Sequence, residues 1–305
     1  MQLKHIPRRF WKKLTKTKLY NYLPDKWAVS IKYRNHFLKK LNLKDPQTFN
    51  EKLQWLKLYD RQPEYTQMVD KYRAKDYIAS LIGKEYIIPT LGVWKSFDEI
   101  DFDTLPDQFV LKCNHGSGDV VICKDKSQLD IQAARKKLTA ALSQDYYLIS
   151  REWPYKNVDR LILAEQYIED SVTHDARDYK FFCFNGRVNC FKIDFDRFSA
   201  HHANWYDRSC SLLPYGEVIC PPCHTKQLNL PDSLAQMIDL AEKLSQKLPF
   251  LRVDFYYVNH RIYVGELTFY PASGLLPYTD MEWDRIMGSW LTLPEYKTTS
   301  SGETL

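Results

Sequence analysis

The chain has 305 residues, 44% of them hydrophobic, which suits one enzyme-sized unit or two small domains with a substantial core. No run of eighteen apolar residues could span a membrane, and the N-terminus has no signal-peptide hydrophobic run. Seven cysteines are an odd number and exclude a small disulfide scaffold, so we expect a cytoplasmic protein with reduced thiols.

Charge is concentrated at the start of the chain. Residues 1–45 hold thirteen Lys or Arg and two Asp, a net charge of +11, and the rest carries −6, which sums to +5. Aromatic residues such as Trp11 and Trp27 lie among these basic residues. This mixture favours an anionic membrane surface at the inner face of the membrane, whereas a solvated helix face explains it equally well. Nucleic acid is not expected, because no zinc finger or RNA-binding motif is present.

A larger domain is predicted over 46–294, after this basic and mostly helical segment (1–45) and before a flexible tail (295–305). Thr48 and Glu51 form a capping-box pattern that predicts a helix start. The other predicted elements follow in chain order: a helix over 69–82, strands over 108–111, 118–123 and 161–168, a hairpin over 179–188 and a helix over 234–248. Helices and strands mix without regular alternation, so we predict the α+β class.

The most informative feature is a late pair of acidic residues in two strand-like runs that flank Asn259-His260. Side chains two apart on a strand share a face, so Arg252 lies beside Asp254, and Glu266 beside Thr268. An odd-length loop would bring Asp254 and Glu266 to the same face, whereas a two-residue turn would separate them. Two carboxylates and a hydroxyl on one face predict a Mg²⁺ site, and a solvated surface hairpin is the alternative.

A second group begins where a predicted strand delivers Lys112 to the loop His115-Gly116-Ser117-Gly118. Glycines let backbone N–H groups approach phosphate oxygens, and a lysine neutralises them. The loop is not a P-loop, because no Gly-Lys-Ser/Thr follows and no helix opens there. An ordinary hairpin turn would also explain the glycines.

Taken together, these segments resemble the ATP-grasp superfamily, in particular its TupA-like branch from teichuronopeptide biosynthesis. The resemblance runs from about Thr48 to Leu276. The segments that carry it are, in order, Phe49–Trp55, Asp70–Tyr72, Phe109–Lys112 with His115–Gly118, Arg151–Trp153 with Tyr155-Lys156, Ala164–Ile168, Asp178–Phe182, Arg252–Tyr256, and Gly265–Thr268 with Pro271–Gly274.

The resemblance implies an ATP-grasp fold, in which two α+β subdomains with antiparallel sheets hold the nucleotide. The subdomain with the phosphate lysine and the glycine loop would cover about 100–170, and the metal-binding subdomain about 171–294. Lys71 and Lys112 would bind ATP phosphates, and Glu169 or Asp170 the ribose. The implied nucleotide-binding residues are Lys71, Lys112, His115, Gly116, Ser117, Gly118, Glu165, Gln166, Tyr167, Ile168, Asp170 and Lys180.

The implied Mg²⁺ ligands are Asp254, Glu266 and Thr268. The family commonly has Asn as the third ligand, and the weaker hydroxyl of Thr268 puts a second ion in doubt. Gln166 stands where some ATP-grasp ligases carry lysine, so the adenine contacts differ.

The implied chemistry is ATP-driven ligation of a carboxylate to an amine through an acyl phosphate, with Arg252, Lys112 and Arg151 as catalytic residues. We expect the substrates to be an amino acid and a uronic acid of a bacterial surface polysaccharide, such as capsule, O-antigen or teichuronopeptide. Aromatic and charged residues near Arg151 and His201 suit a sugar, although aromatic core packing explains them as well. The alternatives are an ATP-grasp kinase that phosphorylates a hydroxyl, and a non-catalytic glycan-binding module.

Cys220 and Cys223 have the C-x2-C spacing of zinc sites. No second cysteine pair follows, so a structural zinc is not expected, and the adjacent His201 and His202 do not favour a metal either.

Overall fold

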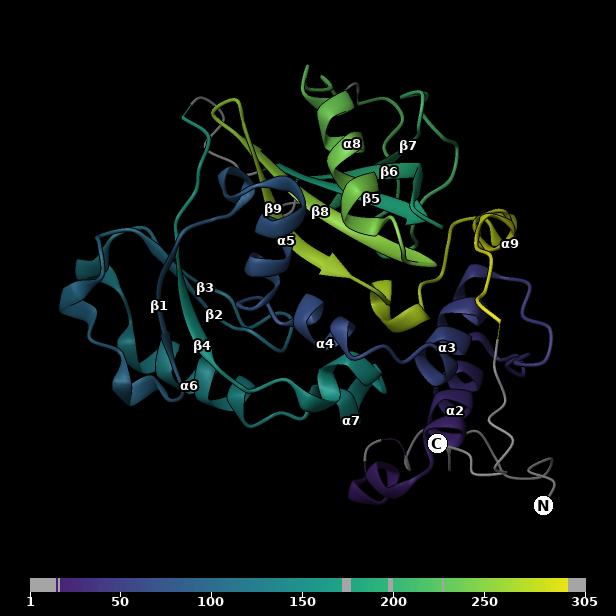
Figure 1. Ribbon diagram of the computed structural model, residues 1–305, viewed down its shortest axis with the longest axis horizontal. Helices are drawn as coiled ribbons and strands as arrows, with labels where there is room; N and C mark the ends of the chain where they lie inside the picture. The colour runs from purple at the N-terminus through teal and green to yellow at the C-terminus, as the bar shows by residue number, and fades with distance from the viewer. Residues whose placement is uncertain (1–14, 16, 172–176, 197–199, 227, 296–305) are drawn as a thin grey trace.

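The computed structural model describes residues 15, 17–171, 177–196, 200–226 and 228–295. The first fourteen residues of the basic N-terminal segment and nearly all of the expected tail lie outside this part of the chain. Two separate antiparallel sheets are present, and helices pack beside them, so the α+β prediction is confirmed (Figure 1). None of the helices in the described ranges has the length and apolar character that a bilayer crossing needs.

The smaller sheet has four strands in the order β1-β4-β2-β3. Helix α6 (Ile131–Leu142) packs against this sheet, and its Leu138 joins Phe109 and Leu111 in one buried cluster. The strands of this sheet are β1 (Thr90–Trp94), β2 (Phe109–Cys113), β3 (Val121–Cys123) and β4 (Ile162–Gln166).

The larger sheet has five strands in the order β7-β6-β5-β8-β9. Helix α8 (Leu234–Ser245) covers one face of it, where Phe181, Phe191 and Phe255 are fully buried. The opposite face carries charged side chains at alternate positions and is the subject of the next subsection. The strands are β5 (Arg177–Phe184), β6 (Arg187–Phe195), β7 (His202–Asp207), β8 (Phe250–Val258) and β9 (Arg261–Thr268).

The remaining helices connect and flank the two sheets. The longer ones are α2 (Asp25–Phe37), α3 (Phe49–Tyr59), α4 (Glu64–Val69), α5 (Ala74–Ile82), α7 (Tyr146–Ser150) and α9 (Met281–Trp290). Short 3-10 turns are η1 (Lys18–Tyr22), η2 (Lys84–Tyr86), η3 (Phe97–Glu99), η4 (Phe102–Thr104), η5 (Lys126–Gln128), η6 (Trp153–Asn157) and η7 (Pro271–Gly274). Helices α3 and α9 lie side by side although more than 200 residues separate them (Figure 1).

The capping box is confirmed, because the Thr48 hydroxyl accepts from the Glu51 N–H and the Glu51 carboxylate accepts from the Thr48 N–H, both at 3.3 Å. The single helix over 69–82 is wrong. The Asp70 carboxylate accepts from the N–H groups of Tyr72 and Arg73, at 2.9 and 3.2 Å, and this local turn competes with the helical ladder. The strands expected over 118–123 and 161–168 are shorter, as β3 and β4.

Candidate active site

The β8–β9 hairpin closes with the two-residue turn Asn259-His260, where both residues have positive φ. A regular register from this turn would pair Asp254 with Gly265 and turn Glu266 to the other face. A β-bulge at Gly265 restores the alignment, because Phe255 pairs with Val264 and Asp254 pairs with Glu266. The expectation that a two-residue turn separates the carboxylates is therefore wrong, and Asp254 and Glu266 do share a face.

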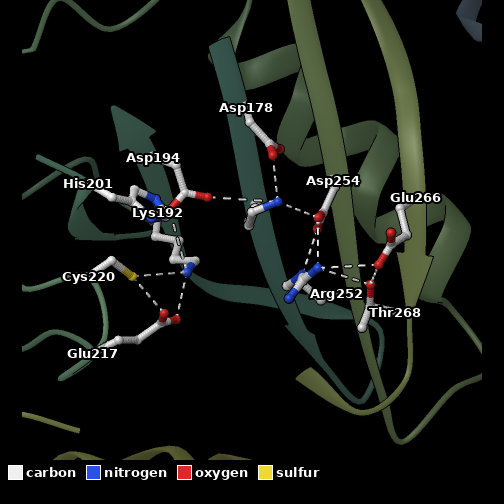
Figure 2. Close-up of polar contacts among 11 residues, drawn as sticks. Asp178, Lys192, Asp194, His201, Glu217, Cys220, Arg252, Asp254, Glu266 and Thr268 are labelled. Carbon is white, nitrogen blue, oxygen red and sulfur yellow. Dashed lines mark hydrogen bonds and ion pairs between the residues drawn. The ribbon is translucent and has the colours of Figure 1, made fainter. Parts of the chain in front are cut away.

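Arg252 lies between these two carboxylates (Figure 2). Its Nε and Nη2 donate to the two oxygens of Asp254 at 2.6 and 2.8 Å, and Nη2 also reaches Thr268 Oγ1 at 3.1 Å and Glu266 Oε1 at 3.5 Å. The Arg252 Nη1 group makes no hydrogen bond within the part of the chain that the structure describes. Arg252 thus forms a bidentate ion pair with Asp254 and keeps one donor group for another anion.

Lys180 of β5 extends this charged row across the sheet. Its Nζ contacts Asp254 Oδ2 and Asp178 Oδ2, both at 2.6 Å. Burial alone would lower the pKa of Lys180, but Asp254 and Asp178 outweigh burial and raise it. Burial alone would raise the pKa of Asp254, but Arg252 and Lys180 hold it below its ordinary value, so Asp254 is a permanent anion near neutral pH.

The oxygens of Asp254, Glu266 and Thr268 are the donor type that Mg²⁺ prefers. The Glu266 side chain is 38% exposed, and its Oε2 makes no hydrogen bond within the described residues, so it can reach an ion. The Thr268 hydroxyl donates to Glu266 Oε1, which keeps the two groups together. These residues fit a hard divalent cation, as the sequence predicts.

The smaller sheet contributes a second set of charges. The buried Glu165 carboxylate of β4 bridges two lysines, with Oε2 at 2.5 Å from Lys112 Nζ and Oε1 at 2.7 Å from Lys75 Nζ. These cations outweigh the effect of burial and lower the pKa of Glu165. Lys75 is absent from the sequence prediction. Its position four residues after Lys71, within a stretch that the sequence predicts to be helical, is the signal that could have identified it.

One cavity brings the two sets together, because Lys71, Lys75, Glu165, Tyr155 and Glu266 all line it. Burial lowers the pKa of Lys71, whose ammonium donates to the backbone oxygen of Gly116 in the glycine loop. The structure therefore gathers the expected phosphate lysine Lys71 and the metal carboxylate Glu266 around a shared space, with Lys112 tied to its rim through Glu165.

The glycine loop follows Lys112 as predicted. Gly118 has φ +86°, and Asp119 accepts a hydrogen bond from the Cys113 N–H, which closes the loop. His115, Gly116, Ser117 and Gly118 line a second cavity. His115 is buried, its Nε2 lies 3.3 Å from the Gln144 oxygen, and burial lowers its pKa. His115 is thus a buried, neutral ring that supports the glycine loop through its contact with Gln144.

The predicted adenine linker lies at the end of β4. Gln166 is exposed, and its N–H donates to the Pro89 oxygen, while Tyr167 OH donates to Glu169 at 2.8 Å. Asp170 Oδ2 accepts from the Asn259 N–H at 3.0 Å, so Asp170 binds the β8–β9 turn. The structure places Asp170 against this turn, and a ribose contact by Asp170 stays a prediction.

The structure does not bring Arg151 to the carboxylates. Its guanidinium is buried and donates to Asp25 Oδ1 at 3.2 Å and to the backbone oxygens of Tyr20 and Asn21 at 2.8 and 3.1 Å. These contacts attach α2 and η1 to the segment after α7. These contacts give Arg151 a structural role, and its catalytic role stays a prediction.

A further cluster, buried except for His201, continues the charged row onto β6 (Figure 2). Asp194, His201 and Cys220 could supply metal ligands, and Asp194 lies 3.2 Å from His201 Nε2. However, the ammonium of Lys192 lies 2.7 Å from Glu217, 3.6 Å from Asp194 and 4.0 Å from Cys220. Lys192 thus places one positive charge of this chain's own residues between the carboxylates of Asp194 and Glu217, which neutralises the cluster in part.

The zinc pattern is not assembled either. Cys220 donates to Glu217 at 2.9 Å, whereas Cys223 contacts Thr225 at 3.4 Å. Burial raises the pKa of Cys220 to about 12, so its thiol is protonated. All seven cysteines are free thiols, as expected.

Solved structures that resemble the chain include ligases and synthetases. An L-amino acid ligase from Bacillus licheniformis is 13% identical, with a TM-score of 0.45 over 83% of this chain and 57% of that one. A D-alanine–D-alanine ligase from Bacillus anthracis complexed with ATP is 16% identical, with a TM-score of 0.37 over 66% of this chain and 53% of that one.

An N5-carboxyaminoimidazole synthetase from Staphylococcus aureus is also 16% identical, with a TM-score of 0.36 over 66% of this chain and 44% of that one. The chain thus spans about half the length of these structures. A search of curated proteins finds no significant match. A profile of the TupA-like ATP-grasp family matches residues 51–292, most of the chain, and the chain therefore belongs to that family, as its motifs predicted.

Proposed function

We propose that this protein is an ATP-dependent carboxylate–amine ligase. The observation that carries the proposal is the arrangement of Asp254, Glu266 and Arg252 on one sheet face, with Glu266 lining the same cavity as Lys71. Phosphoryl transfer to a carboxylate needs three kinds of group: carboxylates that bind a metal ion, a guanidinium with a donor left for the substrate, and lysine ammonium groups that bind phosphate oxygens.

The proposed reaction has two steps. The substrate carboxylate attacks the γ-phosphorus of ATP, which yields an acyl phosphate and ADP. An amine nitrogen then attacks the acyl carbon, the C–O bond to phosphate breaks, and an amide and free phosphate remain. Lys71, Lys112 and Lys180 hold the phosphate oxygens. Bound Mg²⁺ would offset negative charge on the transferred phosphoryl group.

Arg252 is suited to the second step. Its Nε and Nη2 are held by Asp254, so the guanidinium plane is fixed, and Nη1 can bind an oxygen of the acyl phosphate or of the tetrahedral intermediate. A donor fixed before the reaction stabilises developing charge without reorganisation. The ion pair with Asp254 therefore orients the Arg252 guanidinium and also balances its charge.

We further propose that the substrates are an amino acid and a uronic acid of a bacterial surface polysaccharide. The support is the family membership together with the aromatic residues of the 151–156 segment, where Tyr155 lines the cavity with Glu266. Rings of this kind stack on sugars.

Phosphorus NMR tests both proposals. Purified protein is incubated with Mg-ATP, pooled amino acids and a uronic-acid-bearing glycan, with Glu266→Gln as the inactive control. We expect ADP and free phosphate only when both acceptors are present. A new phosphoester signal without free phosphate would identify a kinase instead. No turnover, together with no thermal stabilisation by Mg-ATP, would favour a glycan-binding module.

We also propose peripheral attachment to anionic membranes through the basic N-terminal segment. Next to its described end, Leu19 and Tyr22 are 68% and 85% exposed and Trp27 is 42% exposed. Vesicles of phosphatidylserine and phosphatidylcholine should sediment the full chain but not a chain that lacks residues 1–14, at low salt. Equal recovery of both chains would refute this attachment. This deletion spares Asp25, which Arg61 and Arg151 hold.

A further inference from the structure

A buried lysine lies beneath the turn that follows the metal-binding strand. Lys57 of α3 is only 1% exposed. Its Nζ donates to the Ser150 oxygen at 3.1 Å, to the Ser273 oxygen at 2.7 Å and to Ser273 Oγ at 2.6 Å. An ammonium has three protons, and these three acceptors use all of them. Lys57 therefore joins α3, the end of α7 and η7.

The turn that Lys57 holds has an unusual backbone. Ala272, Ser273 and Gly274 have φ of 45°, 59° and 62°. Left-handed backbone at successive non-glycine residues costs free energy, so it persists only when surrounding contacts impose it. Gln54, one helical turn before Lys57, adds hydrogen bonds from Nε2 to the oxygens of Ser273 and Gly274, at 3.0 and 2.6 Å.

The same location contains a compensating carboxylate. Glu152 is 4% exposed, and burial raises its pKa, while Lys57 and a hydrogen bond from Ser273 oppose that change. Burial also lowers the pKa of Lys57, to about 8, and Glu152 opposes that shift. Burying two charges is expensive for stability, and replacing such a pair by neutral groups of similar size is often harmless to folding. The pair thus suggests a role beyond stability.

This location adjoins the proposed active site. The turn begins three residues after Thr268, and Tyr155 lines the cavity that contains Glu266. The carboxylates of Glu152 and Glu266 both act, after burial, to raise the pKa of Tyr155, so both lie close to this residue. A shift of the turn would therefore displace the groups that position the acyl carbon and the amine for reaction.

We propose that Lys57 is a positioning residue, which holds the Ala272–Gly274 turn in the one geometry that the amide-forming step requires. This inference rests on the ligase function proposed above. Misplacement of reacting groups by about 1 Å costs on the order of 100-fold in rate without preventing substrate binding. Loss of Lys57 should therefore lower kcat about 100-fold and leave the KM for ATP within about twofold.

The test uses the full chain with a charge-neutral double variant, Lys57→Met/Glu152→Gln, so that no charge is left buried alone. Ser273→Ala is a milder second variant, because it removes Oγ and keeps the Ser273 backbone oxygen. Lys52→Met is the matched control. Lys52 lies on the same helix and donates to two backbone oxygens, those of Gly288 and Leu291, at 2.8 and 2.6 Å, but it does not contact the turn.

Hydrogen exchange of peptides over 269–277 reports the turn, and binding of Mg²⁺ with a non-hydrolysable ATP analogue reports the phosphate site. We expect faster exchange in the double variant and in Ser273→Ala, no change over 269–277 in Lys52→Met, and equal nucleotide affinity in all three. Unchanged exchange, or faster exchange with wild-type kcat, would overturn the proposal. If the wild type itself forms no ADP with any acceptor pair, the ligase function fails, and the exchange result alone then decides whether Lys57 holds the turn.

Discussion

The β-bulge predicts a specific clash if Gly265 gains a side chain. An ideal Cβ at Gly265 would lie 2.7 Å from Tyr256 Cε2, 3.3 Å from Cδ2 and 3.4 Å from Cζ. Carbon atoms in contact normally lie about 3.5–4.0 Å apart, so the ring edge must retreat by about 1 Å or the bulge must move. Overpacking of this kind costs about 1–3 kcal/mol. For Gly265→Ala we expect a loss of about 2 kcal/mol in unfolding free energy.

Thermal unfolding measures this loss, which corresponds to about 3 °C in Tm for a chain of 305 residues. In a Tyr256→Leu background the clashing ring edge is absent, so Gly265→Ala should cost at least about 1 kcal/mol less than in the wild type. Tyr257→Leu is the control background, because Tyr257 points to the other face and the effects should add. Additive losses with Tyr256→Leu, or no loss in Gly265→Ala, would refute the clash as the reason for glycine.

The charged row gives further predictions. Arg252→Met leaves Asp254 with Lys180 as its contacting cation, and urea unfolding should show a loss of about 3 kcal/mol; a loss under about 1 kcal/mol would contradict a buried pair. Arg252 and Lys180 hold the pKa of Asp254 below its ordinary value in the folded protein. The ionised carboxylate therefore contributes its full stability above the pKa of the unfolded chain, near 3.9, and this contribution is lost as pH falls through the pKa of the folded state. Asp254→Asn should therefore flatten the acid limb of stability against pH, and an unchanged limb would show that Asp254 is not held low. Thr268→Asn should tighten binding of a second Mg²⁺ to the nucleotide complex several-fold by titration calorimetry, and equal affinity would show that this position does not limit the second ion. Lys112→Met should weaken Mg-ATP binding about 10–100-fold by the same method, and wild-type affinity would exclude a phosphate contact.

The late acidic pair shows what a sequence can and cannot predict. Strand type and the shared faces of Arg252 with Asp254 followed from residue types and the two-residue period of a strand. The pairing of Asp254 with Glu266 depended on whether the number of residues between them places both side chains on one face. The two-residue turn alone predicts opposite faces, and the bulge reverses this result. An isolated glycine within a strand, Gly265, was the available signal for a bulge, but the sequence does not say on which strand the extra residue is accommodated.

Contacts between distant segments were beyond prediction for a different reason. Glu165 was expected to offer its backbone to adenine. In the structure, the carboxylate of Glu165 in β4 contacts Lys112 of β2 and Lys75 of α5, so three separate elements meet at this residue. Likewise, nothing in the α3 sequence tells that Lys57 meets Ser273, 216 residues later. Local patterns specify which side chains share a face, but only the packed fold specifies which faces meet.

The contact of α3 with the end of the chain has a consequence for biosynthesis. Asn50, Gln54 and Lys52 all find their partners after residue 270, in η7, Leu276 and α9. Protein synthesis proceeds from the N-terminus at about 5–20 residues per second, so α3 waits for several seconds or more without these partners. Contacts of such long sequence separation also form late in folding. The Ala272–Gly274 turn and its contacts with α3 therefore form late, after most of the chain has been synthesised.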